Sequence, residues 1–104
     1  MKKKINILGT NYTIIYGKLG LGNIDGLCEP YTQELKVDLT NMGNTENYDN
    51  DQEYYENVLR HEKFHAIFHE AGLVAYEKDE ILIEALATLY PKIEVIMNSQ
   101  KLFN

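Results

Sequence analysis

Cysteine is nearly missing from the sequence: Cys28 is the single example among 104 residues, so no disulfide can form within the chain. A lone free thiol is typical of proteins kept in a reducing compartment. No basic residue stands beside Cys28 in the sequence to activate its thiol as a nucleophile. We therefore expect a cytoplasmic protein in which Cys28 is an inert small side chain.

Basic residues are also scarce, because 10 Lys and Arg face 16 Asp and Glu, which gives a formal net charge of −6. Nucleic acids and anionic membrane surfaces both favour basic partners. We therefore expect neither as a partner. The one basic cluster, Lys2-Lys3-Lys4, is expected to be solvated.

Long apolar runs are missing as well, and none approaches the roughly 20 residues that a membrane-spanning helix needs. The lysines at the start imitate a signal peptide, but polar residues interrupt the apolar run before a hydrophobic region can form. A chain of 104 residues suits one domain with a modest core. We expect a single domain over residues 1–104.

The first 40 residues carry the alternation of apolar and polar side chains that is typical of strands. Alternation on both sides of a turn at residues 9–11 predicts a β-hairpin over residues 5–16. A second hairpin is predicted from residues 27–29 into residues 34–40, where Leu35, Val37 and Leu39 alternate with polar residues. The sequence thus predicts a small antiparallel sheet.

Helical signals follow a polar loop predicted at residues 41–51. Asn50 or Asp51 can cap a first helix, which should run to about Ala71, where Gly72 favours a left-handed stop. This helix carries apolar residues on most sides and should be central to the domain.

A second helix is predicted to begin at the cap Asp79, and Pro91 should end or kink it. Residues 92–103 form either a final helix or a continuation beyond the kink. The expected fold is α+β, a small sheet of hairpins followed by two or three helices.

One five-residue stretch, His61-Glu62-Lys63-Phe64-His65, has the spacing of a zinc-binding helix. Helical residues four apart differ by about 40° in azimuth and about 6 Å in rise. His61 and His65 can therefore both reach one Zn²⁺ ion at about 2.0–2.1 Å. The alternative is a pair of core imidazoles held by neighbouring polar side chains.

A third zinc ligand is expected from the second helix. His69 lies about 12 Å beyond His61 along the helix axis, too far to share the ion. If the connector between the helices is tight, residues equally distant from the turn lie at the same level. Glu84 is then opposite His65, whereas Glu80 is one turn too near the connector.

The motif His61-Glu62-x-x-His65, followed 19 residues after His65 by Glu84 in Glu84-Ala85-Leu86-Ala87, resembles the gluzincin arrangement of zinc metallopeptidases. The small size and the preceding hairpins are similar to metallopeptidases encoded by phages and prophages, related to the ImmA/IrrE-like and SprT-like groups. The resemblance implies a minimal zincin-like fold with Zn²⁺ held by His61, His65 and Glu84, and with Glu62 as catalytic base. Thr88 departs from the pattern, because thermolysin-like enzymes have an aspartate there.

These features predict a metallopeptidase that hydrolyses peptide bonds through a zinc-bound water, with Glu62 as general base and a peptide or protein as substrate. The strand at residues 34–40 is either an edge that binds extended substrate or an interior strand. Two alternatives are a non-catalytic, zinc-stabilised interaction module of phage or prophage origin and a metal-free binding protein. Glu62 favours the enzyme, because a purely structural site does not need an acid between its histidines.

Overall fold

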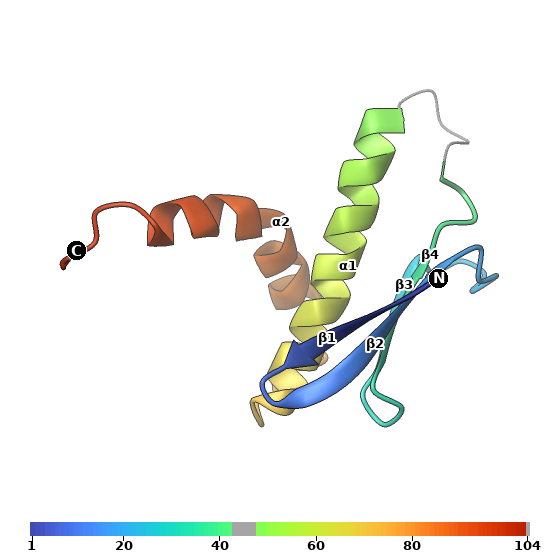
Figure 1. Ribbon diagram of the computed structural model, residues 1–104, viewed down its shortest axis with the longest axis horizontal. Helices are drawn as coiled ribbons and strands as arrows, with labels where there is room; N and C mark the ends of the chain where they lie inside the picture. Colours follow the sequence, from blue (N-terminus) through green and yellow to red (C-terminus); the bar gives the residue numbers. More distant parts are fainter. Residues whose placement is uncertain (43–47, 104) are drawn as a thin grey trace.

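The computed structural model describes the backbone of residues 1–42 and 48–103, and the side chains of these except residues 48–50. A four-stranded sheet is followed by two helices (Figure 1), which confirms the predicted α+β architecture. The strands are β1 (Lys2–Ile7), β2 (Thr10–Gly17), β3 (Gly26–Glu29) and β4 (Glu34–Asp38), and the helices are α1 (Tyr48–Glu70) and α2 (Glu80–Met97). In the described part of the chain, neither helix combines the length and apolar character needed to cross a membrane.

Both predicted hairpins are confirmed, since β1 pairs with β2 and β3 pairs with β4 in antiparallel fashion. The first hairpin turns at Leu8 and Gly9, whose φ angles of 50° and 96° are the left-handed geometry that a two-residue hairpin loop requires. However, β2 pairs with β4 in parallel. The sheet is therefore mixed, whereas the sequence predicted a purely antiparallel one.

The parallel pairing follows from the path of the chain after β2. Residues 17–26 pass the position of β4, so β3 forms an edge of the sheet and β4 returns between β3 and β2, in the order β1-β2-β4-β3. Because β4 is paired on both sides, the strand predicted at residues 34–40 is interior and cannot bind a substrate as an edge. The edge strand on that side is β3.

Asp38, at the end of β4, fixes the loop that leads to β3. Its carboxylate accepts hydrogen bonds from the backbone N–H groups of Leu19, Leu21 and Thr40 at 3.0, 2.8 and 3.0 Å. The Thr40 hydroxyl also donates to it. These bonds, led by that hydroxyl, hold the pKa of Asp38 well below its usual range. The glycine-rich loop is thus anchored where it crosses the end of the sheet.

Helix α1 packs against the sheet and closes the core (Figure 1). Leu35 and Val37, whose alternation predicted β4, are both buried, and Tyr12 and Ala66 lie in the same core. The carboxylate of Glu70 at the end of α1 accepts hydrogen bonds from Thr10 Oγ1 at 2.6 Å and Tyr12 Oη at 2.7 Å. These two bonds tie the end of α1 to β2.

Replacing Glu70 by Gln is expected to destabilise the protein at pH 7 and to matter less in acid. The Thr10 and Tyr12 hydroxyls lower the pKa of Glu70 from its ordinary value of 4.5. A carboxyl whose pKa is lowered by folding stabilises the fold above that ordinary value and loses the effect as the pH falls through the folded value. Urea unfolding of both proteins with a chelator present, at pH 7 and pH 3, measures the difference. An equal difference at both pH values would contradict this, and Glu56→Gln on the same helix is the control.

The helix ends follow the predicted signals only in part. Gly72 has φ +75° and the Leu73 N–H donates to the Phe68 carbonyl at 2.9 Å, as in a left-handed C-terminal stop. Asp79 caps α2 and accepts from the Leu82 N–H at 3.0 Å, as predicted. The N-terminal end of α1 differs from the prediction. This helix begins at Tyr48, so the predicted caps Asn50 and Asp51 fall within its first turn. The predicted loop at residues 41–51 overlaps residues 43–47, which lie outside the described residues.

Pro91 lies inside α2, which is bent (Figure 1) and continues to Met97, so the predicted kink is found and the helix does not end there. Proline lacks an N–H group, and the carbonyl four residues earlier therefore loses its helical partner. That carbonyl belongs to Ala87, and it accepts instead from Arg60 Nε of α1 at 2.9 Å. A side chain of α1 thus satisfies the bond that the proline removes.

Candidate metal centre

His61 and His65 lie one turn apart on α1, and their imidazoles converge. The two Nε2 atoms are 3.2 Å apart, and both rings are largely buried, with 16% and 14% of the side chain exposed. Two Nε2 atoms at this distance need a proton or a metal ion between them, because two lone pairs repel each other.

The outer ring nitrogens, Nδ1 of each histidine, both lie beside hydrogen-bond acceptors. His65 Nδ1 lies 2.5 Å from the backbone carbonyl oxygen of Glu77. Since a carbonyl can only accept, Nδ1 of His65 carries a hydrogen and Nε2 faces the centre. His61 Nδ1 likewise donates to Glu84 Oε2 at 2.6 Å. Both histidines are therefore held as metal-binding histidines usually are, with the outer nitrogen bonded to an acceptor.

Glu80, in the first turn of α2, completes the cluster. Its carboxylate oxygens lie 2.7 Å from His61 Nε2 and 3.0 Å from His65 Nε2. The candidate ligand atoms of His61, His65 and Glu80 all lie within 4.8 Å of one another. A carboxylate and two imidazole nitrogens are a donor set that suits Zn²⁺. A cation at their centre could bind both Nε2 atoms and a carboxylate oxygen, so the residues fit the metal that the sequence predicted.

The third ligand predicted from the sequence, Glu84, does not lie in this cluster and takes a different position. It is behind His61, where Oε1 accepts from Asn57 Nδ2 at 2.9 Å and from Thr88 Oγ1 at 3.0 Å. Burial would raise the pKa of Glu84, but the hydrogen bonds, led by that from His61, outweigh it and lower the pKa. Glu84 therefore orients His61, a task for which the sequence offered no residue, and Thr88 supports it.

The prediction that Glu84 lies opposite His65 assumed a tight connector between the two helices. The connector is not tight. Glu77 lies beside α1: its carbonyl contacts His65, and its carboxylate lies 2.6 Å from His69 Nδ1. The connector thus runs back along α1 before α2 begins, which moves α2 by about one turn and brings Glu80 to the level predicted for Glu84. His69 contacts Glu77 and lies outside the cluster of candidate ligands.

Glu62, the predicted base, is only 7% exposed. It packs against β3, where a Cβ atom on Gly26 would be 2.8 Å from Glu62 Oε2. Only glycine permits this approach of the strand to the helix. Burial raises the pKa of Glu62, and the nearby His61 and His65 oppose the rise only in part. For His61 itself, burial lowers the pKa, but the bonds to Glu84 and Glu80 outweigh it and raise the pKa.

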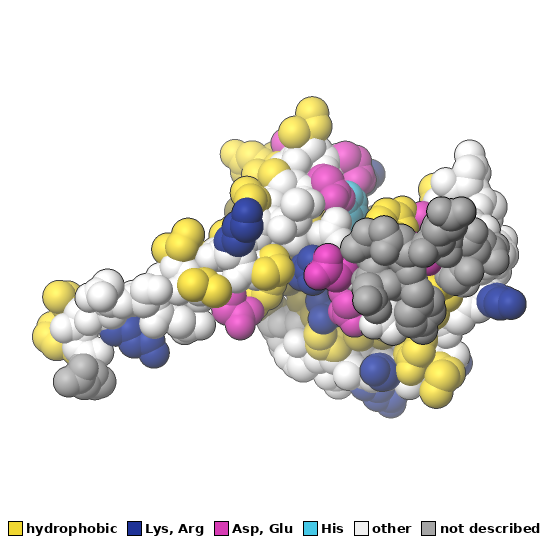
Figure 2. Space-filling model, turned by 90° about the horizontal axis from the view of Figure 1, so that it is seen from above, with side chains coloured by type: hydrophobic (Ala, Val, Ile, Leu, Met, Phe, Trp, Pro, Cys, Tyr) yellow, Lys and Arg dark blue, Asp and Glu magenta, His cyan; other side chains and the backbone are white. Residues whose placement is uncertain are grey.

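These groups surround an open cavity of about 510 Å³ between β3, α1 and the connector. At the surface, histidine atoms are visible beside acidic side chains (Figure 2). Cys28 of β3 also lines the cavity, and burial, followed by the charges of Glu62 and Glu77, raises the pKa of its thiol to about 12. Such a thiol is protonated at neutral pH and is not a nucleophile. The side chains that line the cavity are Ile24, Leu27, Cys28, Pro30, Tyr31, His61, Glu62, His65, His69, Glu77, Lys78 and Glu80, with the backbone of Gly26.

No family model, curated protein or solved structure matches this chain.

Proposed function

We propose that this chain is a small, gluzincin-like zinc metallopeptidase, with His61, His65 and Glu80 as metal ligands and Glu62 as general base. The observation that carries the proposal is the convergence of two Nε2 lone pairs and a carboxylate beside a buried glutamate. Three protein ligands next to a cavity are typical of catalytic zinc, which keeps one position open. Structural zinc sites have four ligands, often cysteines, and the chain has one cysteine.

Zinc bound here would supply a Lewis acid, which polarises a carbonyl group and lowers the pKa of a coordinated water towards ~7. The other roles fall to the protein. Glu62 would accept the proton of the attacking water and pass it to the leaving amine. Glu84 and the Glu77 carbonyl hold the two imidazoles in the required tautomer. Each side chain of the cluster thus has a role in peptide hydrolysis.

The substrate would bind along β3. This strand pairs with β4 on one side only, and its residues Gly26, Leu27 and Cys28 line the same cavity as Glu62 and the histidines. An extended peptide can add to such an edge through backbone hydrogen bonds. The edge strand proposed to bind the substrate is therefore Gly26–Glu29 and not residues 34–40.

Zinc content and hydrolysis of an unstructured protein such as casein test the proposal. The purified chain should hold about one zinc ion, as a single three-ligand site requires, and cleavage should stop with a chelator and return with zinc. His61→Ala should lose the metal, whereas His69→Ala, its control on the same helix, should keep it. Absence of zinc binding would overturn the proposal. Zinc without hydrolysis of casein or of short peptides would favour the zinc-stabilised interaction module.

A further inference from the structure

The molecule exposes more surface than a protein of its size usually does. Its accessible surface is 7542 Å² for 12.0 kDa, whereas a folded monomer of this mass has about 6,000 Å². Its radius of gyration is 14.9 Å, against about 13 Å for a compact domain of this length. The excess, about 1,500 Å², exceeds the roughly 800 Å² that each partner buries in a standard protein interface.

The residues beyond the bend of α2 are among the most exposed of the chain. Residues 92–103, which we name the C-terminal arm, extend away from the sheet and α1 (Figures 1 and 2). Five large apolar side chains of the arm are between 66% and 88% exposed: Val95, Ile96, Met97, Leu102 and Phe103. A monomer rarely exposes so dense an apolar segment, which usually marks an interaction site.

The direction of the arm is built into the fold. Before the bend, α2 is held on α1 by Arg60 Nε on the Ala87 carbonyl and by the rings of Phe64 and Tyr90, whose centroids are 6.1 Å apart. Beyond it, the helix ends with a regular C-cap, in which the Asn98 N–H donates to the Glu94 carbonyl. The part of the arm at residues 92–97 is thus a capped helical extension rather than a frayed end.

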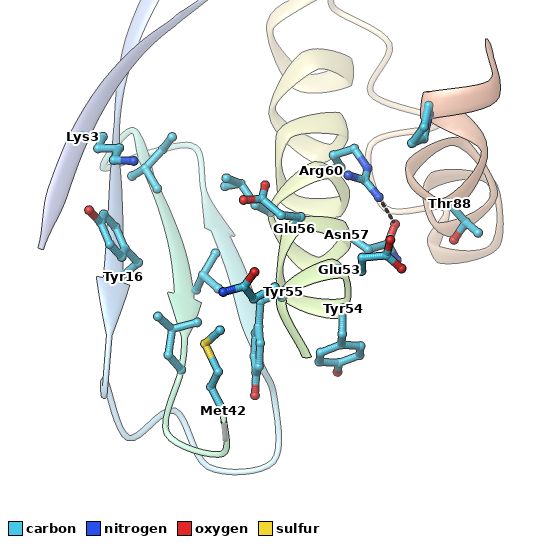
Figure 3. A pocket seen from close by; sticks show the side chains of 16 residues that line it. Lys3, Tyr16, Met42, Glu53, Tyr54, Tyr55, Glu56, Asn57, Arg60 and Thr88 are labelled. Atoms are coloured by element: carbon cyan, nitrogen blue, oxygen red, sulfur yellow. Dashed lines mark hydrogen bonds between the residues drawn. The ribbon is translucent and has the colours of Figure 1, made fainter. Parts of the chain in front are cut away.

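An open groove of about 1160 Å³ lies on the other side of α1 from the metal centre and reaches the root of the arm at Thr88 and Pro91 (Figure 3). Its apolar lining consists of Ile14, Tyr16, Val37, Leu39, Met42, Tyr54, Tyr55 and Leu59, and its acidic residues are Glu53 and Glu56. The arm cannot fill this groove in its own molecule without unbending at Pro91, because it extends in another direction (Figure 1).

We infer that the C-terminal arm of one copy lies in the groove of a second copy, so that two chains exchange arms in a two-fold homodimer. The arm offers exposed apolar side chains with Lys92, Glu94 and Lys101, and the groove offers an apolar lining with Lys3, Glu53, Glu56 and Arg60. Apolar contact rather than charge therefore favours the pairing, and the excess surface of about 1,500 Å² is enough for a stable dimer. Each groove reaches the root of the arm of its own chain. In a two-fold dimer the two arms therefore begin near the symmetry axis, and each can enter the groove of the other chain. The result is a closed dimer rather than an open chain of copies.

Analytical ultracentrifugation tests the dimer, which does not depend on the metal. The parent protein should sediment with twice the mass of 12.0 kDa at concentrations well above ~1 μM. Val95→Asp should weaken the dimer by on the order of tenfold or more, because it buries an unpaired charge. Val74→Asp is the matched control, since Val74 and Val95 are 66% and 67% exposed, and it should remain dimeric. A monomeric parent, or equal effects of both variants, would overturn the inference.

Disulfide cross-linking identifies the surface that the arm contacts. Met97→Cys in the arm and Glu56→Cys in the groove are prepared separately, mixed and oxidised, with the parent and its single Cys28 as control. A disulfide between the two variants is expected. Cross-links only between two Met97→Cys chains would overturn the groove as the contact. A monomer that sediments with phosphatidylcholine–phosphatidylglycerol vesicles would show that the arm binds lipid instead.

Discussion

Glu80→Gln is expected to lose most of its zinc affinity, while Glu84→Gln, the same change one turn later on α2, loses much less. A structural zinc site releases about 10–16 kcal/mol, so one ligand of four contributes on the order of 3 kcal/mol or a factor of 10²–10³. A residue that orients a ligand from behind typically contributes about 10- to 100-fold. Glu80 contacts both Nε2 atoms, whereas Glu84 contacts His61 Nδ1.

Competition with a chromophoric chelator measures both affinities, and circular dichroism checks that each variant is folded. Glu80 is 66% exposed as a side chain, so its replacement should leave the fold intact. Thr88→Val tests the assignment of Glu84 as the residue that orients His61. It removes a hydrogen-bond donor to Glu84 and should lower the zinc affinity less than Glu84→Gln does. If Glu84→Gln lost more affinity than Glu80→Gln, Glu84 would be the third ligand and Glu80 would not.

Glu62→Gln is expected to keep its zinc and to lose hydrolysis. The amide has the size of the carboxylate and can pack against Gly26 in the same way, but it cannot accept a proton from water. General base catalysis contributes about 10²- to 10⁴-fold, and kcat should fall by that factor while the zinc content is unchanged. Lys63→Gln, at the next position of α1, is the control and should keep its activity. Undiminished activity in Glu62→Gln would exclude Glu62 as the base.

The sequence predicted those parts of the fold that depend on neighbouring residues. The alternation around Leu35 and Val37, the cap at Asp79 and the helix stop at Gly72 each act within a few residues, and each is found. The parallel pairing of β2 with β4 could not be predicted, because it depends on where the chain crosses the sheet. The interior position of residues 34–40 follows from that crossing.

The residues of the candidate site also fall into two groups, those that local spacing brings together and those whose position depends on the path of the chain. His61, Glu62 and His65 share one helix, so their spacing alone brings them together. Glu80 belongs to another helix, and its position depends on the path of a connector that no local pattern describes. Glu77, whose carbonyl fixes the tautomer of His65, acts partly through its backbone, which leaves no signal in the sequence.

The hydrogen bond from Arg60 to the Ala87 carbonyl also sets the register between the two helices. Glu80 and Glu84 are one turn apart, and a slide of α2 by that turn, about 5.4 Å, would exchange one for the other beside the imidazoles. The ligand predicted from the sequence, Glu84, and the ligand proposed from the geometry, Glu80, thus correspond to two registers of the same helix pair. Pro91 leaves the Ala87 carbonyl of α2 without its helical partner. Arg60 can donate to that carbonyl in only one of the two registers. The residue that bends the helix therefore also selects the carboxylate that faces the two imidazoles of the candidate metal site.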